Sequence, residues 1–101
     1  MTKQGGRQAA SEPALPILEA NAAGLDIGSA EIWVCVPADR DPAPVRRFGT
    51  YTPDLQQLAD WLGACRVTSG AMEATGVYGL PVFGVLEARG LQVSLINPHQ
   101  L

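Results

Sequence analysis

The fold is decided by residues 22–36, which read AAGLDIGSAEIWVCV. The first segment, 22–27, is short and largely apolar, and a Gly-Ser pair follows it. The second segment, 31–36, is β-branched and aromatic, and its alternate apolar residues from Ile32 onward share one face of a strand. Because a short turn joins these two extended segments, we expect them to form a β-hairpin.

Beyond a Pro/Asp loop over 39–44, helical and extended segments alternate. Thr52 and Pro53 mark a helix start, with a hydroxyl as cap and proline at the first helical position, and Asp54 faces the positive end of the helix dipole. Gly90 is well placed to end a second helix. We expect a strand over 45–51, a helix from 52, a strand over 67–73, a helix over 80–89 and a strand over 91–95. The first of these helices should bury one side, formed by Leu55, Leu58, Ala59 and Leu62.

The element order is therefore β-β-β-α-β-α-β. Three successive strands joined by short turns form an antiparallel meander, and later strands separated by helices add in parallel through right-handed crossovers. This order predicts an RNase H-like α/β fold, with a mixed five-stranded sheet and helices packed on it. A different α/β sheet with the same element order is the alternative.

Composition limits the kind of protein. The 101 residues suffice for one small domain, expected over 22–101 after a disordered leader over 1–21. No apolar run reaches the roughly 18 residues of a membrane span, so we expect a cytoplasmic protein. Cys35, Cys65 and His99 lack metal-ligand spacing, which predicts packed thiols and a surface histidine. The net charge of −3 indicates that any nucleic acid is held with help from a metal, another segment or another subunit.

Two acidic residues stand out because they lie in apolar strands. Asp26 lies within the first strand, where a charge is costly unless it is compensated, and Glu73 ends the fourth. If these strands are neighbours, both carboxylates project from the same side and repel each other, a conflict that Mg²⁺ resolves. Two such ions can activate a nucleophile and stabilise the leaving oxygen in phosphodiester cleavage. The alternative is turn chemistry for Asp26 and a solvated strand end for Glu73.

Several motifs together resemble the DEDD transposases of bacterial insertion sequences. They are GLDIG at 24–28, VRRFGT at 45–50 and AMEATGVY at 71–78, and the closing VSLINP at 93–98 is similar as well. The N-terminal domain of that family resembles the RuvC Holliday-junction resolvase. The resemblance covers about residues 23–101. The first motif alone is also typical of actin-like sugar kinases, and the third separates the two families.

The resemblance implies roles for two residues. Asp26 corresponds to the first D and Glu73 to the E of the family's catalytic tetrad, so both are expected as catalytic residues and metal ligands. The other two aspartates of the family lie beyond Leu101, which implies a truncated N-terminal fragment that is inactive alone. Mg²⁺ or Mn²⁺ is expected only together with those aspartates. Family members act on DNA with a structured guide RNA and as oligomers, so these partners are expected, and no small-molecule substrate.

Three hypotheses follow. The first is a truncated transposase whose full-length relatives cleave DNA and transfer strands in a metal-dependent reaction. The second is a catalytically dead remnant that acts only as a folded interaction module. An actin-like phosphotransferase is a third, although its phosphate-binding halves need a far longer chain.

Gly70, Gly79 and Gly84 are expected to weaken the fold, as in a decayed gene copy.

The remaining polar and aromatic residues carry weaker signals. Arg46 and Arg47 are adjacent on a strand and point to opposite faces, so at most one serves any given surface. Trp33 and Trp61 are expected as core or helix-packing groups rather than base-stacking platforms. Tyr78 follows Glu73 closely and either approaches a substrate or packs beneath the second helix.

Overall fold

The computed structural model describes residues 20–96. The predicted element order is confirmed. Most of the expected leader over 1–21, together with His99, lies outside the described residues. The elements are β1 (Ala22–Ile27), β2 (Ile32–Cys35), β3 (Val45–Phe48), α1 (Thr52–Ala64), β4 (Ser69–Ala74), α2 (Gly79–Ala88) and β5 (Gln92–Ile96).

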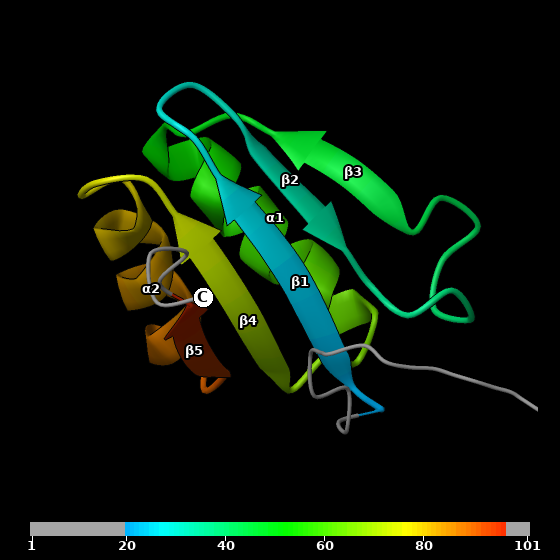
Figure 1. The fold of residues 1–101 in the computed structure, drawn as a ribbon. Coiled ribbons are helices and arrows are strands. Elements are labelled where there is room, and N and C mark those ends of the chain that lie inside the picture. The colour runs from blue at the N-terminus through cyan, green and yellow to red at the C-terminus, as the bar shows by residue number, and fades with distance from the viewer. Residues whose placement is uncertain (1–19, 97–101) are drawn as a thin grey trace, which may run out of the picture.

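The strands form one mixed sheet in the order β3-β2-β1-β4-β5 (Figure 1). β1 pairs antiparallel with β2, and β2 pairs antiparallel with β3. β4 lies parallel to β1 on one side and to β5 on the other. The expected five-stranded RNase H-like sheet is therefore confirmed, with β1 in the middle.

Both helices lie on the same face of the sheet (Figure 1). Two successive right-handed crossovers step across the sheet in one direction, which places α1 and α2 on the same side. The core fills the space between sheet and helices. Its most completely buried side chains are Ile27, Ile32, Val34, Leu58, Leu62, Met72 and Leu86. Within residues 20–96 no helix covers the opposite face, which we call the open face (Figure 1).

The N-cap of α1 lies one residue earlier than the sequence predicts. The helix begins at Thr52, so Tyr51 rather than Thr52 is the N-cap. The Tyr51 backbone N–H donates to Oδ2 of Asp54 at 3.0 Å. The carboxylate thus satisfies a backbone donor ahead of the helix, as the glutamate of a capping box does. Proline in the first turn is confirmed.

Both helices end in the same hydrogen-bonded turn. After α1, the N–H of Arg66 donates to Gly63 and that of Val67 donates to Leu62. After α2, Gly90 donates to Glu87 and Leu91 to Leu86 in the same pattern. This is the Schellman motif, which needs a left-handed residue at its centre. Gly90 has φ +85°, as expected for a terminating glycine, whereas Arg66 adopts φ +57° with a full side chain.

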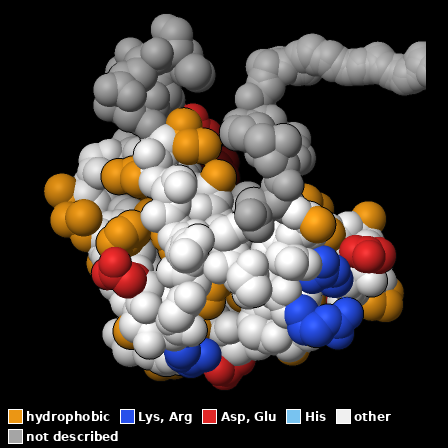
Figure 2. Space-filling model, turned by 90° about the horizontal axis from the view of Figure 1, so that it is seen from below, with side chains coloured by type: hydrophobic (Ala, Val, Ile, Leu, Met, Phe, Trp, Pro, Cys, Tyr) orange, Lys and Arg blue, Asp and Glu red, His pale blue; other side chains and the backbone are white. Residues whose placement is uncertain are grey.

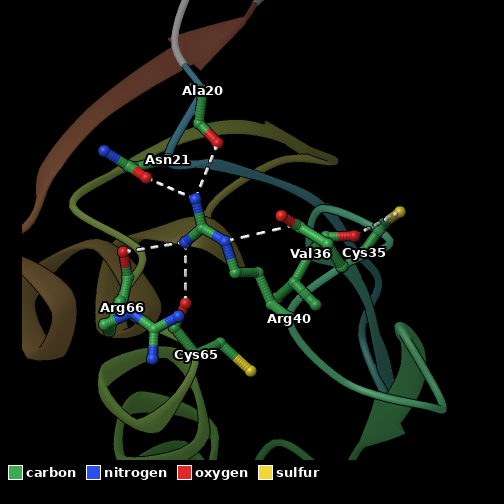
Figure 3. A network of polar contacts seen from close by, with 8 residues as sticks. Ala20, Asn21, Cys35, Val36, Arg40, Cys65 and Arg66 are labelled. Atoms are coloured by element: carbon green, nitrogen blue, oxygen red, sulfur yellow. Dashed lines mark hydrogen bonds and ion pairs between the residues drawn. The ribbon is translucent and has the colours of Figure 1, made fainter.

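Arg40 ties three segments together at the end of the sheet where β1 begins (Figure 3). It comes from the loop expected over 39–44, and its side chain is only 11% exposed. The guanidinium donates to carbonyl oxygens that the helix leaves unpaired, which also lie at the negative end of the helix dipole. Its acceptors are the carbonyls of Cys65 at 2.9 Å, Arg66 at 3.2 Å and Ala20 at 3.1 Å, and the side-chain oxygen of Asn21.

The glycines differ in what they do. The expectation that Gly79 weakens the fold is wrong, because a Cβ there would lie 2.8 Å from Cβ of Ala74 and 3.1 Å from Cε of Met72. Gly70 is also closely packed, with a Cβ position 3.2 Å from a Leu25 methyl. At Gly84 a Cβ would meet nothing within 4 Å, so the helix-propensity cost expected there stands.

Among residues 20–96, no helix combines the length and the apolar character that a membrane crossing requires.

Candidate metal centre on the open face

Asp26 and Glu73 are paired positions of the two central strands. They are direct Cα partners in the parallel pairing of β1 with β4. Paired residues of adjacent strands point the same way and lie roughly 4.8 Å apart. Both side chains are exposed on the open face. The prediction that the two acids project from one side of the sheet is therefore confirmed.

The alternation of each strand explains why the carboxylates are exposed. Leu25 and Ile27 point into the core, so Asp26 between them points away from the helices. Buried Met72 fixes Glu73 in the same way. The expectation that Asp26 bears a burial cost is wrong. An apolar strand with one face open places every second residue in solvent, and a charge there costs little.

The turn reading of Asp26 finds no support in the hydrogen bonds. The turn after β1 is closed by the backbone, with the N–H of Gly28 donating to the carbonyl of Glu31 at 2.9 Å. Within residues 20–96, neither the Asp26 nor the Glu73 carboxylate accepts a hydrogen bond or forms an ion pair. No side chain of this part of the chain therefore competes with a cation for their oxygens.

Two adjacent carboxylates suit a hard divalent cation. Mg²⁺ takes oxygen ligands, keeps several waters and is usually bound by one or two protein carboxylates. The side chains present therefore fit Mg²⁺ or Mn²⁺. In the described part of the chain, no group of three or more His, Cys, Asp or Glu side chains is placed to hold a metal ion. The pair is thus a small ligand set.

The surface beside the acids is a shallow hollow. Gly24 and Ala71 are paired positions of β1 and β4, two residues before the acids on the same face. Both are small, and they form part of the hollow's lining together with Asp26 and Glu73. A bound group can therefore approach the carboxylates closely over the sheet.

A row of paired residues crosses the open face at the level of the acids. Arg47 pairs with Trp33, Trp33 with Asp26, Asp26 with Glu73, and Glu73 with Ile96. Residues paired in this way share one face. The row therefore runs from a cation through an aromatic ring to the two carboxylates.

Trp33 does not pack in the core as expected. It is 45% exposed on the open face, and its indole Nε1–H donates to Oε2 of Glu31 at 3.0 Å. Position 33 lies between inward-pointing Ile32 and Val34, so strict alternation identifies it as an outward residue. The packing expectation is confirmed for Trp61, which is buried in α1.

The two adjacent arginines point to opposite faces, as predicted. Arg46 lies on the helix side, where it forms an ion pair with Asp41 at 3.0 Å. Its guanidinium carbon lies 4.6 Å from the centre of the Trp61 ring. Arg47 lies on the open face and pairs with Glu31 at 3.3 Å. Only Arg47 is placed to contact a group bound near the acids.

Glu31 holds both the aromatic and the cationic side chain. The hydrogen bond from Trp33 and then that from Arg47 lower the pKa of Glu31 below its ordinary value. Both donors favour the ionised form, so the carboxylate is charged at neutral pH. Tyr78, left open by the sequence, is the N-cap of α2 and is 47% exposed rather than packed beneath that helix.

Charges of both signs are interspersed elsewhere on the surface. Seen from below, the described residues show basic side chains in separate groups with acidic ones beside them (Figure 2). The pair between Arg89 and Asp60, 2.9 Å apart on the helix layer, is one such contact. No continuous basic surface is visible among the described residues in this view, in keeping with the net charge of −3.

Comparison with known proteins gives a family. No curated protein matches the chain. A protein-family model for DEDD transposases of the IS110 type, described as a transposase, matches residues 23–101. The match spans most of the 101 residues and includes both acids and all of the sheet except Ala22 at the start of β1. Transposases act on DNA, with nuclease and recombinase chemistry in general. The chain therefore belongs to the IS110-type DEDD transposase family.

Proposed function

We propose that this chain contributes Asp26 and Glu73 as metal ligands to the DNA cleavage and strand-transfer steps of transposition. The observation that carries the proposal is the direct pairing of Asp26 with Glu73 on the open face. Family membership supports DNA as the substrate. The absence of any described hydrogen-bond or ion-pair partner for either carboxylate supports a metal role over a structural one.

The role of each acid follows from its position. Both carboxylates border a hollow whose lining beside them includes the small residues Gly24 and Ala71, so a phosphate oxygen could approach a cation held there. Bound Mg²⁺ or Mn²⁺ supplies charge stabilisation and activation of the attacking oxygen. Asp26 and Glu73 orient that cation from neighbouring strands, and the sheet holds their backbones at a fixed spacing.

The chain is not proposed to cleave DNA alone. Two carboxylates are a small ligand set for the two-ion chemistry of phosphodiester cleavage. We infer that the other two aspartates of the tetrad come from outside residues 20–96. A guide RNA and further copies of the chain complete the proposed assembly. Because RNA is itself anionic and each copy has a net charge of −3, the bound divalent cations supply the attraction for DNA phosphates.

The test is the weak Mn²⁺ affinity that two carboxylates retain without the other aspartates, measured from the electron paramagnetic resonance signal of the free ion. Asp26→Asn and Glu73→Gln should each weaken binding, and the double variant should lose little more than the stronger single one, because both ligands serve one ion. Glu87→Gln is the matched control, since it removes an exposed carboxylate from α2 on the other layer. Strictly additive losses would mean two independent weak sites.

The interaction-module alternative predicts a different outcome. If the chain is a remnant without metal chemistry, wild type and all variants will bind Mn²⁺ equally weakly. Incubation with DNA and Mg²⁺ should give no strand cleavage by this chain alone. Cleavage that Asp26→Asn abolishes would contradict the proposed inactivity while supporting the site.

A further inference from the structure

The exposed end of the paired row lies directly beside the acids. Trp33 is one strand and Arg47 is two strands away from Asp26, on the same face and at the same level. At a strand spacing of roughly 4.8 Å, the two side chains stand about 5 Å and about 10 Å from Asp26 along the row. The row therefore continues the metal centre sideways across β2 and β3.

The Trp33 ring is fixed in place although it is not buried. Its indole N–H is bonded to Glu31, which fixes the ring, while 45% of the side chain remains exposed. Exposed aromatic rings are the surfaces on which unpaired bases stack, and this ring lies beside the two acids. Because the ring is already fixed, stacking adds little ordering cost.

Arg47 supplies the complementary charge. Its side chain is 62% exposed and its described ion-pair partner is Glu31. Guanidinium groups bind phosphate oxygens through paired N–H donors. A phosphate at this position would compete with Glu31 for Arg47, so Glu31 both positions the row and limits its affinity.

We propose that Trp33 and Arg47 form a subsite for a single-stranded segment of the DNA substrate. The base next to the reacting phosphate stacks on Trp33, and a neighbouring backbone phosphate binds Arg47. The inference rests on the proposed function, because the reacting phosphate is placed at Asp26 and Glu73. A single strand is required, since a base inside a duplex is already stacked and cannot lie against a protein ring.

The first test follows the two tryptophan indole N–H signals by NMR during titration with a short single-stranded oligodeoxynucleotide. Trp33→Phe and Trp61→Phe assign the signals, and buried Trp61 is the internal reference. The Trp33 signal should shift with the bound fraction, and the Trp61 signal should not. Binding of the oligonucleotide that leaves Trp33 unmoved would overturn the subsite.

Substitutions separate stacking from charge. Trp33→Ala should weaken binding about tenfold, as loss of one stacked base does, while Trp33→Phe keeps most of the affinity. Arg47→Ala should weaken binding and reduce the salt dependence by about one ion. Arg89→Ala removes the same charge from the helix layer and should change neither the affinity nor its salt dependence. If Arg47→Ala and Arg89→Ala lose the same affinity, net charge alone explains the binding, and the subsite is contradicted.

Glu31→Gln provides a gain-of-binding test. Glutamine keeps an oxygen for the Trp33 N–H but removes the charge that holds Arg47. Binding should become several-fold tighter, with a steeper salt dependence. Unchanged or weaker binding would contradict competition for Arg47. An oligoribonucleotide of the same sequence should bind more weakly than the DNA, and tighter binding would assign the row to RNA instead.

The outcomes also distinguish this subsite from the metal proposal. A Mn²⁺ response of Asp26 and Glu73 without a Trp33 shift would leave the metal centre standing and remove the subsite. A Trp33 shift without a Mn²⁺ response would show that the row binds a single strand, but it would remove the metal centre and with it the placement of the reacting phosphate beside Trp33. If no variant of Trp33 folds, the Arg47 and Glu31 series still decides the matter.

Discussion

Asp26 faces Trp33 across β1 and β2, so that a half-exposed aromatic ring is fixed beside the first acid of the proposed metal centre. The same backbone position of Asp26 pairs with Glu73 on its other side. One residue of the central strand therefore joins the aromatic and acidic halves of the row. The pairings depend only on strand register, which the buried alternate residues hold in place.

Arg66→Gly should stabilise the fold by about 1 kcal/mol, because a left-handed backbone costs an L-residue roughly that much and glycine almost nothing. The carbonyl of Arg66 that accepts from Arg40 is backbone and is retained. Urea denaturation of both proteins measures the difference. Gly90→Ala is the reciprocal test at the end of α2 and should destabilise, and a neutral result for both would refute the strain argument.

Gly84→Ala and Gly79→Ala should have opposite effects although both lie in α2. Space around Gly84 is free, so alanine should stabilise the helix by about 0.5–1 kcal/mol. At Gly79 the added methyl meets Ala74 and Met72 and should destabilise by about 1–3 kcal/mol through overpacking. Thermal unfolding of the two variants decides the point, and stabilisation by Gly79→Ala would mean that α2 packs differently on β4.

Arg40→Ala should destabilise the protein by about 1.5–3 kcal/mol, because it leaves carbonyls at the end of α1 without their charged donor. Arg40→Lys should recover part of the loss, since one ammonium cannot reach all the acceptors. Arg89→Ala breaks an exposed ion pair and should cost at most about 1 kcal/mol. Equal effects of Arg40→Ala and Arg89→Ala would deny Arg40 its linking role.

The reactivities of the two cysteines with a thiol reagent should differ and show whether the open face is accessible. Cys35 lies exposed on it, whereas Cys65 is buried, and burial raises the pKa of the Cys65 thiol. A raised pKa means less reactive thiolate at any pH below it. A thiol reagent should therefore modify one cysteine quickly in the native protein, and both in denaturant. Peptide mapping should place the fast reaction at Cys35; protection of Cys35 would mean that something covers the open face.

Much of the fold follows from local sequence. The order of strands and helices follows from periods of two and of about 3.6 residues, and Gly90 is recognisable as a helix end. The N-cap of α1 differs by one residue because the Asp54 carboxylate accepts from the Tyr51 N–H, whereas the sequence favours the Thr52 hydroxyl as the cap. Arg40 carries no local signal, since its acceptors lie 19 to 26 residues away in sequence.

The candidate site was predictable only in part. Pairing of Asp26 with Glu73 follows once β1 and β4 are neighbours, which the element order implies. The size and apolar character of Trp33 favour a buried position, whereas strand alternation between Ile32 and Val34 favours an exposed one. The structure follows the alternation. The part played by Glu31 depends on the geometry of a turn and on Arg47 from another strand, and neither is visible in local sequence.

The most direct test of the central claim is the location of bound Mn²⁺ by paramagnetic broadening of backbone amide signals. Substoichiometric Mn²⁺ should broaden the signals of Asp26, Glu73 and their strand neighbours first, with α1 and α2 less affected because they lie behind the sheet. Asp26→Asn and Glu73→Gln should each remove most of this effect, and Glu87→Gln should not. Broadening centred elsewhere, or undiminished in both variants, would contradict the assignment of Asp26 and Glu73 as one metal centre.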